Sequence, residues 1–432
     1  MILKKKINHY LDILFPINRS ITGDGVRNTL KILQEIVPLT IKEYPSGQKV
    51  FDWIIPDEWN VKDAWIKNEN GKKIVDYKVS NIHLVNYSTP VDAKISFKEL
   101  KHHLYCHNKI PDAIPYRTTY YNRDWGFCVT KSQYKELENS SGSLEVFIDS
   151  NFNENGSLTF GEILIPGKSK NEILISTYIC HPSLANDNLS GLLMTAFLAN
   201  ELLMKSELKR SYRIIWIPET IGAIAYCAFN KKNMKKIDSG LVITCVGGPG
   251  KFGYKKSFDR NHSVNAVIET VFQEEGIQFK SYPFDIHGSD ERQYSSQGFR
   301  INVASLTKDK YYEYPFYHSS LDNLDYIKAE YIDQSLRLHL KVLYKLDTEP
   351  IYKNRYPNCE INLSKHKLYP TIGGNQLPEK QKNKLDYILW LLWKCDGKKG
   401  IYGLSKQLGV SHFEILEIAK LLERKKIIIK VF

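Results

Sequence analysis

Residues 173–191 read ILISTYICHPSLANDNLSG, and this stretch decides the fold class. It begins as a short apolar strand and ends where a helix is predicted from about residue 189. His181 and Asp187 lie in the loop between these two elements. Ligands of α/β sheets bind in loops that follow the carboxyl ends of strands, so this imidazole and this carboxylate suit a zinc-class ion. A core histidine beside a helix-capping aspartate is the alternative interpretation.

The sequence around this stretch alternates between strands and helices. Nearly continuous apolar runs predict buried strands, and longer periodic segments predict helices. Such alternation indicates an α/β fold whose sheet is covered by helices on both faces. The predicted strands are 143–148, 161–165, 173–177, 212–217 and 241–246, and the predicted helices are 189–205 and 330–347.

The remaining segments predict further domains. Short β-rich runs between Pro, Gly and Asn signals indicate an inserted β module, and a Pro- and Gly-rich segment after the last helix indicates a linker. The C-terminal segment resembles a winged helix-turn-helix, in which Ser411 caps the second helix of the motif. The predicted domains are the α/β domain (1–46 and 141–348), the β-rich module (47–140), the linker (349–379) and the winged helix-turn-helix-like domain (380–432).

Composition places the chain among ordinary globular proteins. Of its 432 residues, 42% are hydrophobic and 25% are charged, which excludes disordered, collagen-like and coiled-coil chains. The formal charge of +12 lies in short basic runs such as Lys4–Lys6 and Lys231–Lys236, each typical of a solvated face. We therefore do not expect nucleic acid as a partner.

Cysteine usage and the N-terminal residues predict a cytoplasmic protein. The seven cysteines are odd in number and form no CxxC pair, which disfavours a disulfide framework. The N-terminus lacks the apolar core and cleavage site of a signal peptide, and no apolar run approaches the ~18 residues of a membrane span. We expect reduced thiols and no membrane partner.

Further polar clusters follow other predicted strands. Glu219 comes directly after the strand at 212–217, and Cys245 lies at the end of the next one. Two more polar stretches come later, DIHGSDER at 285–292 and YHSSLDN at 317–323. So many polar clusters near strand ends indicate a functional site at one edge of the sheet.

The order of these motifs, His, Asp-Asn-x-Ser-Gly, Glu, Gly-Ser-Asp and Tyr-His-Ser-Ser-x-Asp, resembles that of the co-catalytic zinc aminopeptidases of the bacterial leucyl-aminopeptidase and glutamate-carboxypeptidase type. The resemblance covers residues 144–345. The whole chain resembles bacterial aminopeptidase-like proteins associated with polysaccharide biosynthesis, which combine such a domain with an inserted β module and a C-terminal winged helix. It implies a mixed sheet flanked by helices and a site with one or two zinc ions.

The resemblance also implies a role for each motif residue. His181 matches a metal ligand, Asp187 the metal-bridging carboxylate, and His318 the ligand of the second metal. Glu219 matches the general base, which would take a proton from water and pass it to the leaving amine. The expected substrate is a small molecule that bears an amine or an amide.

Three positions depart from the family pattern. Thr220 stands where the family has the second glutamate of a pair, and Cys245 where it has an aspartate. Ser183 replaces the aspartate that would orient the first imidazole. A site with a single metal is therefore an alternative, with Glu219 as ligand or base and Cys245 as a further candidate ligand, although a small buried residue is the commoner role of such a cysteine.

Other polar residues are candidates for substrate binding. They lie in the stretch after residue 285, in the aromatic and charged cluster that begins at Tyr121, or in the polar loop between the first two helices. Helix caps, solvated ion pairs and surface turns are the alternatives. The candidates are Asp290, Arg292, His287, Arg123 and Arg19.

The combined prediction is a metal-dependent hydrolase of the aminopeptidase type that cleaves an amide bond. One alternative is an amidase or deacylase that acts on a sugar or a sugar-linked amino acid, and another is a non-catalytic binding or regulatory protein. Glu414 and Glu417 lie in the first turns of the helix that would read DNA, where they would oppose phosphate. We expect this domain to pack against the catalytic core or a second subunit, and a homo-oligomer is compatible with the sequence.

Overall fold

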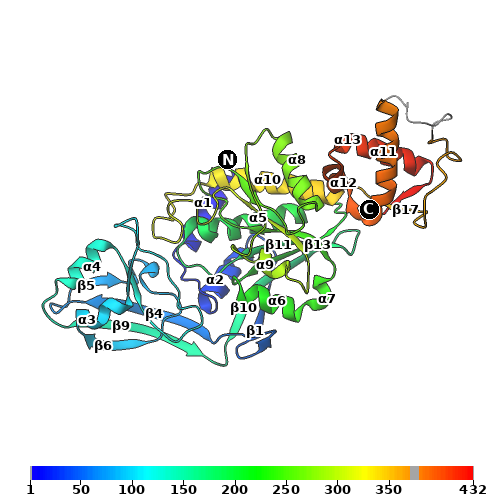
Figure 1. Cartoon of the computed structure of the whole chain (residues 1–432). Coiled ribbons are helices and arrows are strands. Elements are labelled where there is room, and N and C mark those ends of the chain that lie inside the picture. Colours follow the sequence, from blue (N-terminus) through cyan, green and yellow to red (C-terminus); the bar gives the residue numbers. More distant parts are fainter. Residues whose placement is uncertain (1, 370–378, 432) are drawn as a thin grey trace. The chain divides into compact units, whose positions relative to one another are not determined.

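The computed structural model describes residues 2–369 and 379–431 (Figure 1). The chain forms two compact units, which are described separately below. The first consists of Met1–Lys255 and Phe279–His339, and the second of Lys256–Gln278 and Leu340–Phe432. Among the described residues, no helix has both the length and the apolar character to span a membrane.

An eight-stranded mixed sheet forms the centre of the first unit. The strands are, in spatial order, β1 (Thr40–Pro45), β10 (Ser157–Ile165), β12 (Ser211–Ile217), β11 (Glu172–Tyr178), β13 (Ile237–Ile243), β16 (Asn302–Thr307), β14 (Gly253–Lys255) and β15 (Lys280–Tyr282). The four middle strands are parallel, and the strand next to them on each side, β10 or β14, pairs antiparallel with this group. The edge strands are β1, which pairs antiparallel with β10, and β15, which pairs parallel with β14.

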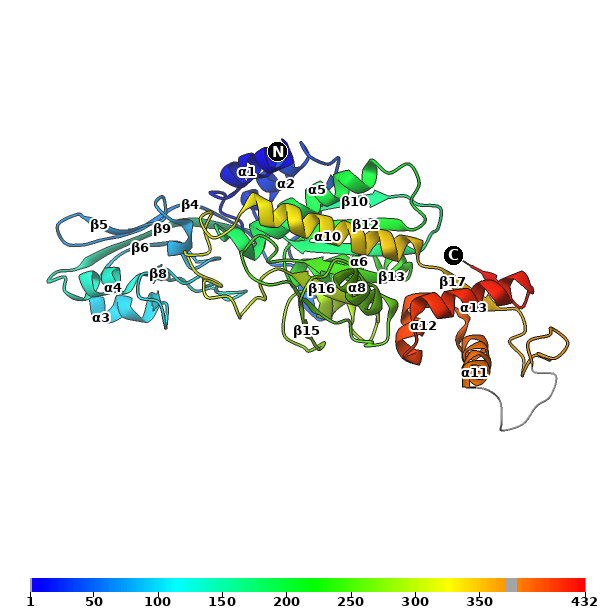
Figure 2. The same ribbon diagram turned by 90° about the horizontal axis from the view of Figure 1, so that it is seen from above.

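Helices cover both faces of this sheet, as the strand pattern predicts (Figure 2). Every residue of β11, β12 and β16 is buried. This burial explains why the apolar centres of β11 and β12 read as runs rather than as an alternation, whereas β16 (NVASLT) has no such run and was not predicted. On one face, α6 (Ile221–Phe229) packs on Leu174, Ile215 and Val242. The helix α5 (Gly191–Leu203) contacts β11 and β13, and α2 (Asp24–Leu33) contacts β10. The first unit also contains α1 (Ile2–Leu14), α7 (Lys231–Met234), α9 (Glu291–Tyr294) and the first part of α10 (Ala329–Thr348), and its inserted module contains α3 (Phe97–Leu100) and α4 (Lys131–Glu138).

The inserted module is built on a four-stranded antiparallel sheet within the first unit. Its core contains Trp59, Phe127 and Val146. The strand β9 belongs to this sheet, whereas the sequence analysis placed residues 141–153 in the α/β domain. Pairing of β9 with β4 along nearly its whole length buries Val146 and Ile148 against the module, which explains the difference. The strands are β5 (Lys73–Asp76), β4 (Glu58–Lys67), β9 (Leu144–Asn153) and β6 (Val91–Ile95), with the separate pair β7 (Leu104–Cys106) and β8 (Phe127–Val129).

The second unit contains the winged helix. Gly409 adopts a left-handed conformation after α12, and the Ser411 hydroxyl accepts a hydrogen bond from the backbone N–H of Phe413, so the predicted turn and cap are present. The predicted linker differs, because β17 at its start pairs with both other strands of the domain's sheet. Residues 370–378 of that linker lie outside the described residues. The elements are β17 (Ile351–Asn354), α11 (Glu379–Lys394), β18 (Asp396–Gly400), α12 (Ile401–Leu408), α13 (His412–Arg424) and β19 (Ile428–Lys430).

A helix from the predicted α/β segment also groups with this unit. The helix α8 (Ser263–Glu274) contacts α12, and Lys406 forms an ion pair with Glu269. The C-terminal domain therefore shares its unit with residues 256–278, which the sequence analysis assigned to the α/β domain. The helix α12 of the winged helix-turn-helix thus packs against α8, which comes from a much earlier part of the sequence.

A buried ion triad in the large sheet provides a stability prediction. Arg213 of β12 lies between Glu162 of β10 and Glu172 of β11, and all three side chains are buried. Arg213→Met would remove the cation partner of the buried Glu172 and one of the two cation partners of Glu162, which also pairs with Lys42, so we expect the free energy of unfolding to fall by about 3–5 kcal/mol. Urea unfolding followed by circular dichroism measures this change.

A matched control uses an exposed ion pair in the same unit. Lys168 pairs with Glu207, and both side chains are largely exposed to solvent. Because exposed pairs contribute at most about 1 kcal/mol, Lys168→Met should leave the unfolding curve almost unchanged. An equal loss in the two variants would contradict the assignment of the triad as a stabilising element.

Candidate active site

His181 and Asp187 lie in the loop between β11 and α5, and both are buried. The carboxylate of Asp322 anchors this loop, since it accepts hydrogen bonds from the backbone N–H groups of Asn186 (2.7 Å) and Asp187 (3.0 Å). The hydroxyl of Tyr178, at the end of β11, donates to Oδ1 of Asp187. These contacts direct the other oxygen of Asp187, Oδ2, away from the tyrosine and toward the cavity side.

His318 completes a group of three side chains around one point. Its Nε2 lies 2.9 Å from Oδ2 of Asp187, and one nitrogen or oxygen from each of His181, Asp187 and His318 lies within 4.8 Å of the others. The rings of the two histidines are 5.5 Å apart between centroids. The structure thus brings together the three residues predicted as metal ligands, although they are up to 137 positions apart in the sequence.

The donors of this group fit a zinc-class ion. Oδ2 of Asp187 and Nε2 of His318 are buried, and neither makes a hydrogen bond of good geometry within the described residues. Two imidazoles and one carboxylate form the ligand set of many catalytic zinc sites. Burial lowers the pKa of His181 to about 4, which keeps its imidazole neutral near pH 7. Burial opposes ionisation of Asp187, but the two nearby imidazoles hold the pKa of this carboxyl below its usual value.

Glu219 lies on the same side of the cavity, directly after β12. One oxygen of its carboxyl lies within 4.8 Å of both Sγ of Cys180 and a ring nitrogen of His181. Burial, followed by the negative charge of Asp187, raises the pKa of Glu219 to about 7. A carboxyl with a pKa near neutrality can both accept and donate a proton at physiological pH, as a general base must.

The three departures from the family pattern have structural explanations. Thr220 has a φ of 63° and donates its backbone N–H to Oδ1 of Asp290 at 2.8 Å. Cys245 is buried 3.9 Å from Oδ1 of Asp187, on the far side from His318, and burial raises the pKa of its thiol, as expected for a packed cysteine. Ser183 donates to the backbone oxygen of Phe15 at 2.7 Å, so it does not orient an imidazole.

Three predicted substrate-binding residues lie away from the cavity. Arg19 is buried and donates to the backbone oxygens of Leu14, His181 and Pro182, so it holds the loop that carries His181. Arg123 pairs with Asp57 on the module. His287 is exposed and makes its hydrogen bonds through its backbone: its oxygen accepts from Lys255, and its N–H donates to Asp285 at 2.9 Å.

The other two predicted residues are closer to Glu219. Arg292 lines the cavity and donates to the backbone oxygen of Ile286. Asp290 is buried behind Thr220, and burial together with the charge of Glu219 raises the pKa of its carboxyl. The structure therefore places one of the five predicted substrate-binding side chains, that of Arg292, on the cavity surface.

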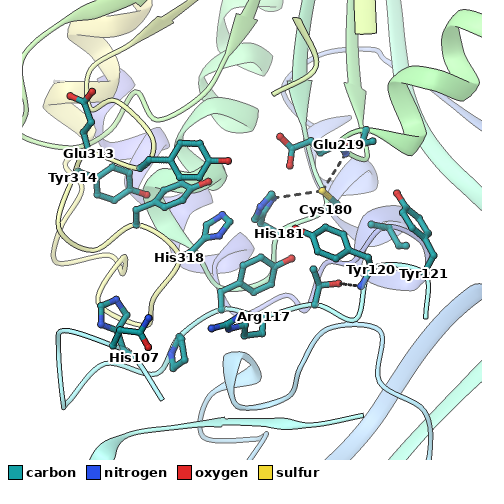
Figure 3. A pocket seen from close by; sticks show the side chains of 18 of the residues that line it. His107, Arg117, Tyr120, Tyr121, Cys180, His181, Glu219, Glu313, Tyr314 and His318 are labelled. Carbon is teal, nitrogen blue, oxygen red and sulfur yellow. Dashed lines mark hydrogen bonds between the residues drawn. The ribbon is translucent and has the colours of Figure 1, made fainter. Parts of the chain in front are cut away.

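The cavity has a volume of about 1240 Å³, and the inserted module forms much of its wall (Figure 3). Figure 3 shows His181, His318 and Glu219 on one side, with His107 and Arg117 across from them. A β-bridge between Pro115 and Ser319 connects the module to the loop of His318. These module residues were not among the predicted site residues, although Tyr121 belongs to the aromatic and charged cluster noted in the sequence. The aromatic run in PYRTTYY at 115–121 is the signal that could have found them.

Tyr116 of the module contacts both candidate histidine ligands. Its backbone N–H donates to the backbone oxygen of His318 at 2.8 Å. Its ring centroid lies 5.2 Å from that of His181 and 5.1 Å from that of His318. The module therefore packs directly on both imidazoles and restricts the positions that they can adopt.

Comparisons with known proteins agree with this architecture. Residues 8–349 match the model of a family described as a domain of unknown function (DUF4910), and residues 350–430 match a winged helix-turn-helix model. A Clostridium acetobutylicum protein, named as a candidate polysaccharide biosynthesis protein with an aminopeptidase-like domain, is 39% identical over 429 residues. That alignment covers 98% of this chain and 96% of that protein.

Solved structures show the same fold. A crystal structure of a candidate peptidase from Clostridium acetobutylicum superimposes with a TM-score of 0.81 at 38% identity, over 99% of this chain and 96% of that one. A zinc aminopeptidase from Bacillus subtilis superimposes with a TM-score of 0.58 at 13% identity, over 80% of this chain and 94% of that one. At such low identity the second match supports the fold alone.

Proposed function

The chain belongs to the DUF4910 family of aminopeptidase-like proteins, and we propose that it is a metal-dependent hydrolase that cleaves an amide bond with water. The resemblance predicted from the sequence motifs and the predicted α/β fold with a C-terminal winged helix are both confirmed. The observation that carries the proposal is the meeting of His181, Asp187 and His318 beside Glu219 at the carboxyl ends of the parallel strands.

We assign His181, Asp187 and His318 to the binding of one zinc ion. The aspartate and the second glutamate that would complete a second metal site are Cys245 and Thr220 here, so the donors favour a single ion. A zinc ion supplies Lewis acidity toward a carbonyl group and lowers the pKa of water.

The protein groups would perform the proton transfers. Glu219 takes the proton of the attacking water molecule and then gives it to the nitrogen of the leaving amine. Tyr178 and Asp322 hold the carboxylate and the backbone of Asp187 in place. Tyr116 packs against the two imidazoles, which would restrict their orientation.

Metal analysis with a substrate panel tests this proposal. We expect about one zinc ion for each chain, because one complete set of three donors is present. Turnover of aminoacyl anilides or N-acylated amino sugars should be lost on treatment with 1,10-phenanthroline and should return when zinc is added. Turnover that persists in the metal-free protein would contradict the proposal.

The same panel separates the alternative functions. The name of the Clostridium acetobutylicum relative connects that protein with polysaccharide biosynthesis, which favours an amidase or deacylase of a sugar or a sugar-linked amino acid as the second candidate. Turnover restricted to acylated amino sugars would select it. Stoichiometric zinc with no turnover of any amide would instead favour the non-catalytic alternative.

Positive charge is concentrated in the C-terminal domain, which corrects the interpretation that the charge lies only in short, scattered basic runs. Residues 350–430 hold sixteen lysines and arginines against seven aspartates and glutamates, a formal +9 of the chain's +12. The exposed first turns of α13, however, present Phe413, Glu414 and Glu417. Carboxylates at these positions oppose contact with phosphates, so we retain the proposal that α13 does not read DNA.

A further inference from the structure

We propose that the cavity takes an amide substrate whose saccharide part carries an anionic group, and that residues 106–121 of the inserted module bind this group. The inference rests on the proposed hydrolase function and names its class of substrate. It depends on the distribution of charge and aromatic rings over the cavity wall, which differs between the side of the metal ligands and the side of the module.

Cationic side chains without carboxylate partners line the module side of the cavity. Lys109 and Arg117 are exposed, and neither forms an ion pair with a carboxylate in the described part of the chain. Of the residues that line the cavity, Glu219 and Glu313 are the acidic ones, and Glu313 is already paired with Lys280 at 3.1 Å. The module wall is therefore positively charged, and an anionic group of a ligand would pair with its two cationic side chains.

Local contacts hold these two cations at the wall. Nδ1 of His107 accepts hydrogen bonds from the backbone N–H groups of Lys109 (3.2 Å) and Ile110 (2.9 Å), which fixes the turn that presents Lys109. The guanidinium of Arg117 lies 5.4 Å from the ring centroid of Tyr105, in a cation–π contact. For Arg117, whose side chain is already restrained by this contact, less side-chain freedom is lost when an anion binds, which favours affinity.

Exposed aromatic rings surround the same cavity. Tyr120 is 68% exposed, Tyr312 is 64% exposed and Trp53 is 37% exposed, and all three line the cavity. The rings of Tyr121 and Trp53 form an edge-to-face pair with their centroids 5.3 Å apart, and this contact helps to fix the orientation of the indole. Aromatic faces left in solvent are suited to stacking against the C–H faces of a sugar ring, whereas a small aliphatic side chain would cover little of them.

The anion site is adjacent in the chain to the candidate metal site. Arg117 directly follows Tyr116, whose backbone and ring contact the loop and the imidazole of His318. One molecule could therefore place its amide near Glu219 and its anionic group near Arg117. A saccharide that joins the two groups would also contact the aromatic rings of the cavity, which a free carboxylate or phosphate would not.

Calorimetric titration of the full-length protein with four probes tests the proposal. The probes are N-acetylglucosamine, N-acetylglucosamine 1-phosphate, N-acetylmuramate and inorganic phosphate. We expect one or both charged sugars to bind about tenfold or more tightly than the neutral sugar, since a charged hydrogen bond contributes about 1.5–3 kcal/mol. A charged sugar that does so should also bind more tightly than inorganic phosphate, and added salt should weaken its binding. The tighter charged sugar identifies the anion as phosphate or carboxylate.

Variants assign the effect to the module wall. The double variant Lys109→Glu and Arg117→Glu should lose the preference for charged sugars, and the double glutamine variant should lose most of it if charge reversal impairs folding. Lys101→Glu is the control, because Lys101 is exposed on the same module but does not line the cavity. Equal affinity for neutral and charged sugars, or a preference retained in both double variants, would overturn the proposal.

The binding measurement is independent of turnover. If charged sugars bind through the module wall but no amide is cleaved, the hydrolase function fails while the saccharide site stands. If amides are cleaved but the charged sugars show no preference, the assignment of the module wall fails while the hydrolase function stands.

Discussion

Asp187→Asn is expected to remove bound zinc and hydrolysis together while the fold is retained. Oδ2 of Asp187 faces Nε2 of His318 at 2.9 Å, and its other oxygen accepts from Tyr178. An asparagine of the same size offers one oxygen instead of two, and the tyrosine would compete for it. Loss of an outer-shell partner of a ligand alone costs about 10–100-fold in metal affinity, so loss of the ligand should cost at least about 100-fold.

Metal content after dialysis, measured by mass spectrometry, checks this expectation. Asp325→Asn is a matched control, because Asp325 lies three residues after Asp322 and is exposed. It should keep its zinc and its turnover. Circular dichroism should give the same secondary structure for both variants. An Asp187→Asn protein with full zinc content would show that Asp187 is not a ligand.

The candidate site could be predicted because its residues follow strands of one sheet. Parallel strands end at one edge, so His181 after β11 and Glu219 after β12 had to lie near each other once the strands were recognised. The imidazole of His318 comes from an irregular loop, and only the resemblance of its motif to the zinc aminopeptidases connected it with the others. Secondary structure alone would not have placed it.

Residues whose role depends on long-range packing could not be predicted. Arg19 lies in a polar loop in the sequence, but its guanidinium is buried and donates hydrogen bonds to three backbone oxygens. The early strand β17 follows a proline and looks like part of a linker, yet it pairs between β18 and β19. Such pairings between distant segments leave no local pattern in the sequence.

The contribution of the module to the cavity was missed for a related reason. The bridge from Pro115 to Ser319 joins two irregular loops that are about 200 residues apart in the chain. Neither loop has the alternation of apolar and polar residues that marks a strand, so hydrophobic periodicity does not predict that they pair. The composition of 115–121 contained the only local signal, because four of its seven residues are aromatic or cationic rather than typical turn residues.

Glu219→Gln is expected to lower kcat by about 10²–10⁴-fold, the usual contribution of a general base. Glutamine has the same shape but cannot accept the proton of water. The carboxyl of Glu219 lies close to both Cys180 and His181, and its raised pKa of about 7 leaves a substantial fraction able to accept a proton at neutral pH. Single-turnover measurements on a substrate from the amide panel give the rate of the chemical step.

Metal content distinguishes the two roles that the sequence left open for Glu219. If Glu219 is the base, the variant should keep about one zinc ion for each chain and should lose only the rate, because His181, Asp187 and His318 still hold the ion. Zinc lost together with the rate would make Glu219 a ligand. Glu207→Gln, at an exposed position, controls for the change of carboxylate to amide. Full turnover by Glu219→Gln would remove this residue from the mechanism, because water would then be activated without it.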